Sequence, residues 1–342
     1  MRKSVAVGLA IALLCLGGAS LAGADTLGYY VQGSTVNLGG PAYDWWYGCS
    51  PTSAGMMMGY YDIHGYAGKS YAKLVPGGTA ESKTGSSNFN TTYQKDITYK
   101  VNNIIASYGY VTDYYRNSSG TPDYTNGGTD PGYYNNSKDD APGAPAYNCL
   151  AYYMGTSQDA LGNSNGSTPF TCWTSGAKFT AQDAYNLGVW NKDGMYGMDE
   201  YFHYCGYGAS DITKDTNFFT QHIYNSSTAP NGFKFADYKK EIDDGRVMMI
   251  QIANDAKHTG HSMFGYGYVD NGLGQQYILC HNTWDDGVYE MLWGGIYSEM
   301  TQWGVVGFDP TGGSPVPLPG AVWLLGSGLL GLWGAKRRWS NS

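Results

Sequence analysis

The chain has 342 residues, enough for one large domain or two small ones, and only 14% of them are charged, with a formal net charge of -8. No basic stretch lies between the two ends of the chain, which argues against a nucleic acid as a partner. The 50 glycines and 32 tyrosines predict many loops and tight turns, with aromatic rings compensating for scarce Leu and Ile.

The N-terminus has the three parts of a secretory signal peptide. A basic start at 1–3 precedes an apolar run at 5–16, and 22–24 offers small residues for cleavage. We therefore expect residues 1–24 to be removed and the rest of the chain to leave the cytoplasm. The apolar run is too short to favour the alternative, a retained membrane anchor.

The segment 47–62 is typical of a cysteine set at the start of a helix. Proline is favoured at the first helical position because the N–H that it lacks would have no partner there. The sequence therefore predicts Pro51 as the first helical residue, Ser50 as the N-cap and Cys49 just outside the helix. The positive end of the helix would favour a thiolate at Cys49. The alternative is a buried structural cysteine, since free cysteine is among the most buried residue types.

The middle of the chain combines a short helical pattern with a long loop-rich segment. Apolar residues at helical spacing between 94 and 108 predict a helix that faces the core. From 111 to about 167 the composition shifts to Gly, Asn, Ser, Asp and Tyr, with turn signals at 126–128 and 130–132. We expect a surface insertion there rather than a second core. Its acidic residues do not follow the spacing of a calcium-binding loop.

Beyond residue 180 the pattern becomes more regular. Helices are predicted over 199–204 and over 235–244, the second of which ends at Gly245. An apolar run at 247–252 has the length of a strand.

A hairpin is predicted after this strand. One strand begins at His261, a turn follows at 270–272, and the return strand covers 276–280. Such a hairpin would bring His261 and Asn282 together at one end. It would supply a base and a group that orients the imidazole, which a cysteine nucleophile needs.

Cysteine pairing offers a further argument. Five cysteines remain once Cys15 leaves with the signal peptide, and outside the cytoplasm cysteines usually pair. Five thiols cannot all pair within one chain, so one is left over. If Cys49 is the free thiol, the other four allow three pairings, among which the sequence does not choose. The disulfide candidates are Cys149, Cys172, Cys205 and Cys280.

Three motifs resemble those of C39-like peptidases, a papain-like group. Gly-Cys-Ser-Pro-Thr at 48–52 resembles their Gly-Cys-Gly-Pro-Thr/Ala start of the nucleophile helix. Gly-His-Ser-Met at 260–263, with Gly-Tyr further on, resembles their Gly-His-x-Val segment. Asn-Thr-Trp at 282–284 is similar to the Asn-Ser-Trp that orients the histidine in papain-like enzymes. The matches follow the family's order and cover about 44–62 and 235–295.

The resemblance implies a papain-like α+β fold over residues 25–312. A helical half would carry Cys49, and an antiparallel sheet half would carry His261 and Asn282. Cys49 would attack a peptide carbonyl, and His261 would act as its base and then protonate the leaving amine. Asn282 would hold the imidazole ring, with Asp285 as an alternative orienter.

The resemblance also implies an oxyanion hole and a cleft. The backbone N–H of Cys49 would be one donor to the oxyanion. The family usually places a glutamine shortly before the nucleophile, where this chain has Tyr43 and Asp44. Gln32, through a longer loop, or Asp44 is therefore the candidate for the second contact. The expected cleft residues are Trp45, Trp46 and Trp284.

The C-terminus carries a second signal. Val-Pro-Leu-Pro at 316–319 precedes an apolar segment at 320–335 and a basic cluster at 336–338. This pattern resembles the Val-Pro-Leu-Pro variant of the PEP-CTERM sorting signal, which exosortase recognises in Gram-negative bacteria. The apolar segment is just long enough for a transmembrane helix, with the basic cluster on the cytoplasmic side. The resemblance implies processing by exosortase within 315–338, transient membrane insertion, and a mature protein at the outer surface or in the extracellular matrix. An ordinary C-terminal membrane anchor is the alternative.

The sequence thus predicts an exported cysteine peptidase that acts on peptides or proteins without a cofactor. A zinc site at His258, Cys280 and His281 is conceivable. We prefer to interpret these histidines as surface residues or supports of the site, and we expect no metal. A transpeptidase or an amidase would share the acyl-enzyme chemistry. The alternative function is a catalytically inactive papain-like scaffold that serves as a structural or adhesive protein at the cell surface.

Overall fold

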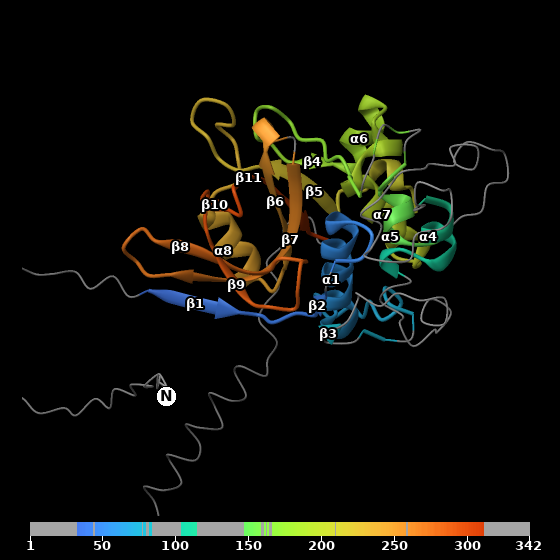
Figure 1. Cartoon of the computed structure of the whole chain (residues 1–342), viewed down its shortest axis with the longest axis horizontal. Coiled ribbons are helices and arrows are strands. Elements are labelled where there is room, and N and C mark those ends of the chain that lie inside the picture. The colour runs from blue at the N-terminus through green and yellow to red at the C-terminus, as the bar shows by residue number, and fades with distance from the viewer. Residues whose placement is uncertain are drawn as a thin grey trace, which may run out of the picture.

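The computed structural model describes residues 33–43, 45–76, 78–79, 82–83, 104–114, 147–158, 161, 163, 166–208, 210–257 and 259–310. This part of the chain is an α+β fold in which a group of helices lies beside a mainly antiparallel sheet (Figure 1). The predicted signal peptide, the sorting tail, the start of the 94–108 helix and most of the 111–167 segment lie outside the described residues.

The strands of the described part are β1 (Ser34–Asn37), β2 (Ala42–Tyr43), β3 (Ser82–Lys83), β4 (Phe179–Thr180), β5 (Phe218–His222), β6 (Met248–Asn254), β7 (Thr259–Asp270), β8 (Gln276–His281), β9 (Tyr289–Leu292), β10 (Ile296–Tyr297) and β11 (Met300–Phe308). The two longest strands are β7 and β11, and the others are shorter.

The described helices fall into six α-helices and three short 3-10 turns. They are α1 (Cys49–His64), α4 (Tyr108–Tyr114), α5 (Leu150–Tyr153), α6 (Ala181–Leu187), α7 (Gly194–Tyr204) and α8 (Phe235–Asp243), with η4 (Trp190–Lys192), η5 (Ile212–Lys214) and η6 (Asp255–Lys257).

Strand β7 pairs with three other strands in the described part of the sheet, namely β1, β6 and β8. The strand order there is β4-β5-β11-β6-β7-β8-β9, with β1 beside β7 and β10 beside β11. The first half of β7 pairs with β6, where His261 faces Ile252. Its second half pairs with β1 and with β8, where Phe264 faces His281. The predicted hairpin is confirmed, and β7 and β8 each extend slightly beyond their expected bounds.

Helix α1 lies between the helices and the sheet and packs against β7 (Figure 1). Its residues from Ser50 to Tyr61 are all buried, as expected of a helix that has neighbours on every side. The helix begins at Cys49, so the predicted start at Pro51 is wrong. Gly48 provides the N-cap with a φ of 142°, and its carbonyl accepts the first helical bond from the N–H of Thr52 at 3.1 Å.

Glycine is required at this N-cap. A Cβ on Gly48 would lie 2.8 Å from Pro51 and 3.0 Å from Thr156, in a backbone conformation that side chains rarely adopt. Pro51 is the third helical residue, still within the first turn, where its missing N–H costs nothing. The Ser50 hydroxyl is not a cap, because it pairs with Ser262 instead.

The later helices agree better with the sequence. Helix α8 confirms the prediction over 235–244, and Gly245 follows with a φ of 81°. Helix α7 confirms the prediction over 199–204 but begins earlier, because the Asp193 carboxylate accepts the N–H of Tyr196 at 3.0 Å and caps it.

The 111–167 segment is not wholly a surface insertion. Val111 and Tyr114 from its start are buried in the main hydrophobic cluster, together with Leu150 and Met154 from its end. The described ends of the predicted insertion therefore belong to the main core, and not to a surface segment. The polar composition of the stretch between them conceals the apolar residues that flank it.

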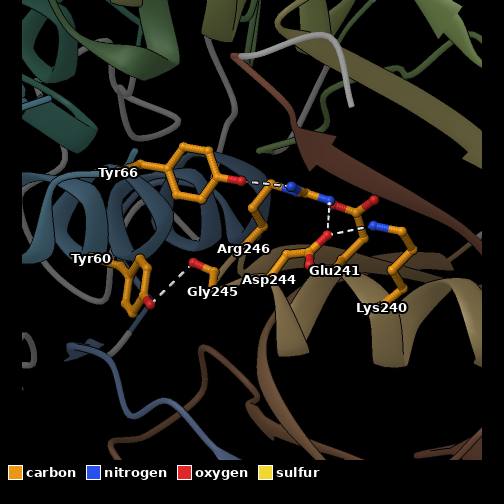
Figure 2. A network of polar contacts seen from close by, with 7 residues as sticks. All are labelled: Tyr60, Tyr66, Lys240, Glu241, Asp244, Gly245 and Arg246. Atoms are coloured by element: carbon orange, nitrogen blue, oxygen red, sulfur yellow. Dashed lines mark hydrogen bonds and ion pairs between the residues drawn. The ribbon is translucent and has the colours of Figure 1, made fainter. Parts of the chain in front are cut away.

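A buried charge network ties the helical half to the sheet half (Figure 2). Arg246 is 1% exposed and donates to the Tyr66 hydroxyl at 2.6 Å, to Asp244 at 2.9 Å, and to Glu241. Tyr66 follows α1, whereas Glu241 and Asp244 belong to the end of α8. Tyr60 on α1 adds a bond from its hydroxyl to the Gly245 carbonyl at 3.2 Å. The two halves are thus joined near the C-terminal end of α1, the end opposite Cys49.

None of the helices in the described ranges has the length and apolar character that a membrane crossing requires. The expected transmembrane segment at 320–335 lies outside those ranges.

Candidate active site

The structure brings Cys49 and His261 together. Cys49 is the first residue of α1 and is partly buried, and His261 is the third residue of β7 and is 6% exposed. The packing of α1 on β7 makes the thiol and the imidazole hydrogen-bonding partners. These two residues, more than 200 positions apart in the chain, therefore form the thiol–base pair that their sequence motifs predict.

The imidazole is held from its other side by the turn after β8. His261 Nε2 lies 2.5 Å from the backbone carbonyl oxygen of Asn282 and 3.2 Å from the Thr283 hydroxyl. A carbonyl can only accept a hydrogen bond, so Nε2 carries the proton and Nδ1 is left as the basic nitrogen. Thr283 in turn donates to the Ser262 carbonyl at 3.3 Å, which leaves its oxygen able to accept from Nε2. This arrangement selects the tautomer that a thiol base needs.

The side chain of Asn282 does not contact the histidine, contrary to our expectation. Its Oδ1 accepts the N–H groups of Trp284 at 2.9 Å and Asp285 at 3.3 Å, and its Nδ2 donates to the Tyr297 hydroxyl at 3.1 Å. The asparagine thus shapes the turn, and its main chain orients the imidazole. Thr283 makes this possible because it has a left-handed φ of 64°, an uncommon conformation that is typical of functional turns.

Asp285 is not the orienter either. Its carboxylate accepts from the Tyr289 hydroxyl at 2.7 and 2.8 Å and from the N–H of Gly287 at 2.8 Å. These contacts hold it at the exposed end of the turn.

The three tryptophans expected at the cleft separate into two groups. Trp284 stacks on the His261 ring, with centroids 4.2 Å apart and an angle of 19° between the planes. It covers one face of the imidazole but is not among the residues that line the cleft, so its expected place in the cleft is not confirmed. Trp45 lines the cleft. Trp46 is 1% exposed and donates from Nε1 to the Ala106 carbonyl at 3.2 Å, so it belongs to the core and its assignment to the cleft is wrong.

A cleft of about 570 Å³ opens over the cysteine and the histidine. One wall is the segment 166–170, which lies at the end of the stretch predicted as an insertion. The other wall comes from β6, β7 and β11. The residues that line the cleft include Trp45, Cys49, Phe170, Gln251, His261 and Trp303. A somewhat larger hollow of about 670 Å³ shares Trp303 with the lining of this cleft, but no cysteine lines it, so we assign the chemistry to the cleft.

A chain of hydrogen bonds joins the nucleophile helix to the sheet beneath the cleft. The Ser50 and Ser262 hydroxyls are 2.8 Å apart, and Ser262 donates to Gln251 Oε1 at 2.7 Å. Gln251 Nε2 is buried and has no partner among the described residues. Gln251 lines the cleft, but this nitrogen is itself enclosed, so a rotation of the side chain would bring the donor to a bound substrate. The sequence analysis missed this residue, although a lone glutamine in the apolar run 247–252 was a signal for it.

Electrostatics distinguishes Cys49 from the other cysteines. Burial by itself raises the pKa of its thiol, but the hydrogen bond and the charge of His261 lower it. The Ser262 backbone and the Ser50 hydroxyl add to this effect, and the net pKa is below 9.0. Ser50 has one proton, which can serve either Ser262 or the sulfur. Cys49 therefore carries more thiolate at neutral pH than an ordinary cysteine does.

The other four thiols have the opposite shift. Burial raises the pKa of Cys149 and of Cys205 to about 11, and that of Cys172 and of Cys280 to about 12. All five are free in the structure, so none of the expected disulfides forms there. The four candidates belong to different elements, namely the start of α5, the loop before β4, the end of α7 and β8. Cys49 is thus distinguished from the other cysteines by its environment, and not by being an odd thiol.

Comparison of the chain with protein-family models, with curated proteins and with solved structures finds no match in any of the three. The assignment of a function therefore rests on the geometry of this site.

Of the residues expected to form the oxyanion hole, only Cys49 lies within the described part of the chain. The N–H of Cys49 belongs to the first turn of α1, where backbone donors have no helical partner. Gln32 and Asp44 lie outside the described residues, as does His258. His281 is 5% exposed, and its Nδ1 lies 2.9 Å from the Gly287 carbonyl. It therefore supports the turn that carries Asn282, in keeping with our interpretation of it as a support.

Proposed function

We propose that this chain is an exported cysteine peptidase of the papain-like, C39-like type, which hydrolyses peptide bonds through Cys49 and His261. One observation carries the proposal. Cys49 is the one mature cysteine whose pKa is lowered, and its partner is a histidine whose other nitrogen is fixed by the Asn282 carbonyl. The α+β architecture, with the thiol on a helix and the base on an antiparallel strand, supports a papain-like fold.

In the proposed reaction the Cys49 sulfur attacks the carbonyl carbon of a peptide bond. His261 receives the thiol proton on Nδ1 and delivers it to the leaving amine, so that an acyl-enzyme remains. Water then attacks the acyl carbon, with His261 as its base, and releases the acid. The N–H of Cys49 donates to the oxyanion. The unpaired Nε2 of Gln251 offers a second donor to a carbonyl of the bound chain.

Selective alkylation tests the nucleophile. Cys172 is the internal control because it is also partly exposed and its pKa is raised to about 12. At pH 7, iodoacetamide should label Cys49 faster than Cys172, and the difference should disappear in His261→Ala, as followed by peptide mass spectrometry. Equal labelling of the two residues in the folded protein contradicts the proposal.

A peptide library tests the reaction itself. The wild-type protein should cleave it, and Cys49→Ala and His261→Ala should not. Fast labelling of Cys49 without cleavage of any peptide would favour the inactive surface scaffold, and transfer of the acyl group to an added amine would favour a transpeptidase.

We further propose that the protein is exported and sorted to the outer surface or the extracellular matrix, with exosortase as the partner that processes residues 315–338. Support comes from the signal-peptide pattern at 1–24 and the tripartite pattern at the C-terminus. In a Gram-negative host that has an exosortase, the mature protein should lack both segments by intact mass. Retention of the apolar segment in the mature product would contradict processing.

A further inference from the structure

Three side chains that can bind a metal converge outside the cleft. Asp199 and His203 lie one turn apart on α7 and so share a face of the helix, and Asp215 follows η5. One ligand atom from each of the three lies within 4.8 Å of the other two. None of them lines the cleft over Cys49. The cluster is therefore separate from the candidate active site.

Asp199 is the unusual member. It is completely buried, and neither of its carboxylate oxygens has a hydrogen-bond partner within the part of the chain that the structure describes. Burying a carboxylate without a partner costs several kcal/mol, so native proteins pair such groups or bind a cation with them.

The other two ligands are already oriented. Asp215 is 3% exposed, and its Oδ2 lies 2.9 Å from His203 Nε2, while its Oδ1 accepts the N–H of Asn217 at 2.8 Å. Gly208 leaves room for the imidazole, because a Cβ there would lie 2.4 Å from His203 Nε2. The cluster thus has two buried carboxylates and one imidazole. Asp199 and His203 are held by α7, and Asp215 is held by the segment that follows η5.

We propose that Asp199, His203 and Asp215 bind a divalent transition-metal ion, Mn²⁺ or Zn²⁺. Two carboxylates balance the charge of one divalent ion, which removes the cost of the two buried negative groups. An imidazole ligand argues against Ca²⁺ and Mg²⁺, which prefer oxygen ligands. Three protein ligands leave the remaining positions of the ion to water.

The ion would connect α7 to the loop that leads into β5. The start of α7 in turn holds one wall of the cleft, because the N–H of Gly194 donates to the Pro169 carbonyl at 2.8 Å and Asp193 accepts the N–H of Thr171 at 2.6 Å. We therefore infer a structural role, with stability as its direct readout. This inference does not depend on the peptidase activity.

Metal titration tests the site. The purified full chain would carry Cys49→Ala, so that the active-site thiol and histidine do not bind the added ion together. After chelation and removal of the chelator, Mn²⁺ and Zn²⁺ are added separately. We expect one ion per chain by elemental analysis. At a concentration of about 100 Kd the ion should raise the thermal unfolding midpoint by about 5 °C or more.

Two matched variants identify the ligands. Asp199→Asn keeps the shape but removes the charge, so it should abolish the metal-induced shift and raise the unfolding midpoint of the metal-free protein. Glu200→Gln, the next residue on the same helix, should retain the shift. If Asp199→Asn does not fold, His203→Gln replaces it, since this side chain is 20% exposed. Absence of a bound ion, or equal shifts in the ligand variant and in Glu200→Gln, overturns the proposal.

Discussion

Replacing Arg246 by alanine should destabilise the protein by about 3–5 kcal/mol, the range for removing one partner of a buried ion pair. The side chains of Arg246 and Glu241 are only 2% and 9% exposed. The substitution leaves the Glu241 carboxylate buried without its cation. It also removes the donor to Tyr66, and so one of the links between the two halves of the fold (Figure 2).

The cost comes mainly from Glu241. Asp244 keeps its contact with Lys240 at 2.5 Å after Arg246 is removed, and it is more exposed. If the buried, unpaired charge causes the loss, then its removal should restore stability. The double variant Arg246→Leu with Glu241→Leu is therefore expected to recover most of the free energy that the single substitution loses.

Urea unfolding, followed by tryptophan fluorescence, measures these differences. Lys240→Ala is the matched control, because it removes a mainly exposed ion pair in the same network and should cost less than about 1 kcal/mol. A cost of under about 1 kcal/mol for Arg246→Ala would refute the reasoning. So would a double variant that is no more stable than the single one.

Three predictions concern the site. The alkylation rate of Cys49 should rise with pH to a midpoint below 9.0, because the lowered pKa keeps the thiolate present at lower pH. The variant His261→Ala should move this midpoint upward. A midpoint at or above 9.0 in the intact protein would contradict the lowered pKa. Asn282→Ala should reduce kcat by about tenfold, since it loosens the turn, and not by the ~10⁴ of a wrong tautomer, because the main-chain carbonyl remains. A loss as large as that in His261→Ala would mean that the side chain orients the ring. Gln251→Glu should lower kcat/KM by about tenfold, because the variant keeps the acceptor for Ser262 but loses the amide donor. The pH profile of Cys49 alkylation in the same variant separates this loss from the effect of the added charge on the thiolate. An unchanged kcat/KM would exclude a contact with substrate.

The sequence predicts best the helices and strands that are specified by residues close together in the chain. Helix α8 and the β7–β8 hairpin follow the sequence closely, because periodicity, capping and turn residues act over a few positions. The start of α1 was misplaced because a glycine with a φ of 142° caps it, and no Ser-Pro pattern reveals that conformation. The burial of Val111, Tyr114, Leu150 and Met154 is not predicted by the sequence, because it depends on contacts with distant elements.

For the site, the sequence by itself determined the candidate chemistry: a cysteine before a helix, a histidine at the start of a strand, and an asparagine after the return strand. Only the tertiary structure decided how these groups act. The φ of Thr283 makes the Asn282 carbonyl, and not its side chain, the group that orients the imidazole. The tertiary structure also determines which cysteine has a lowered pKa, because a pKa depends on burial and on partners from other elements. Both properties arise from packing between residues far apart in the chain, which local sequence patterns do not encode.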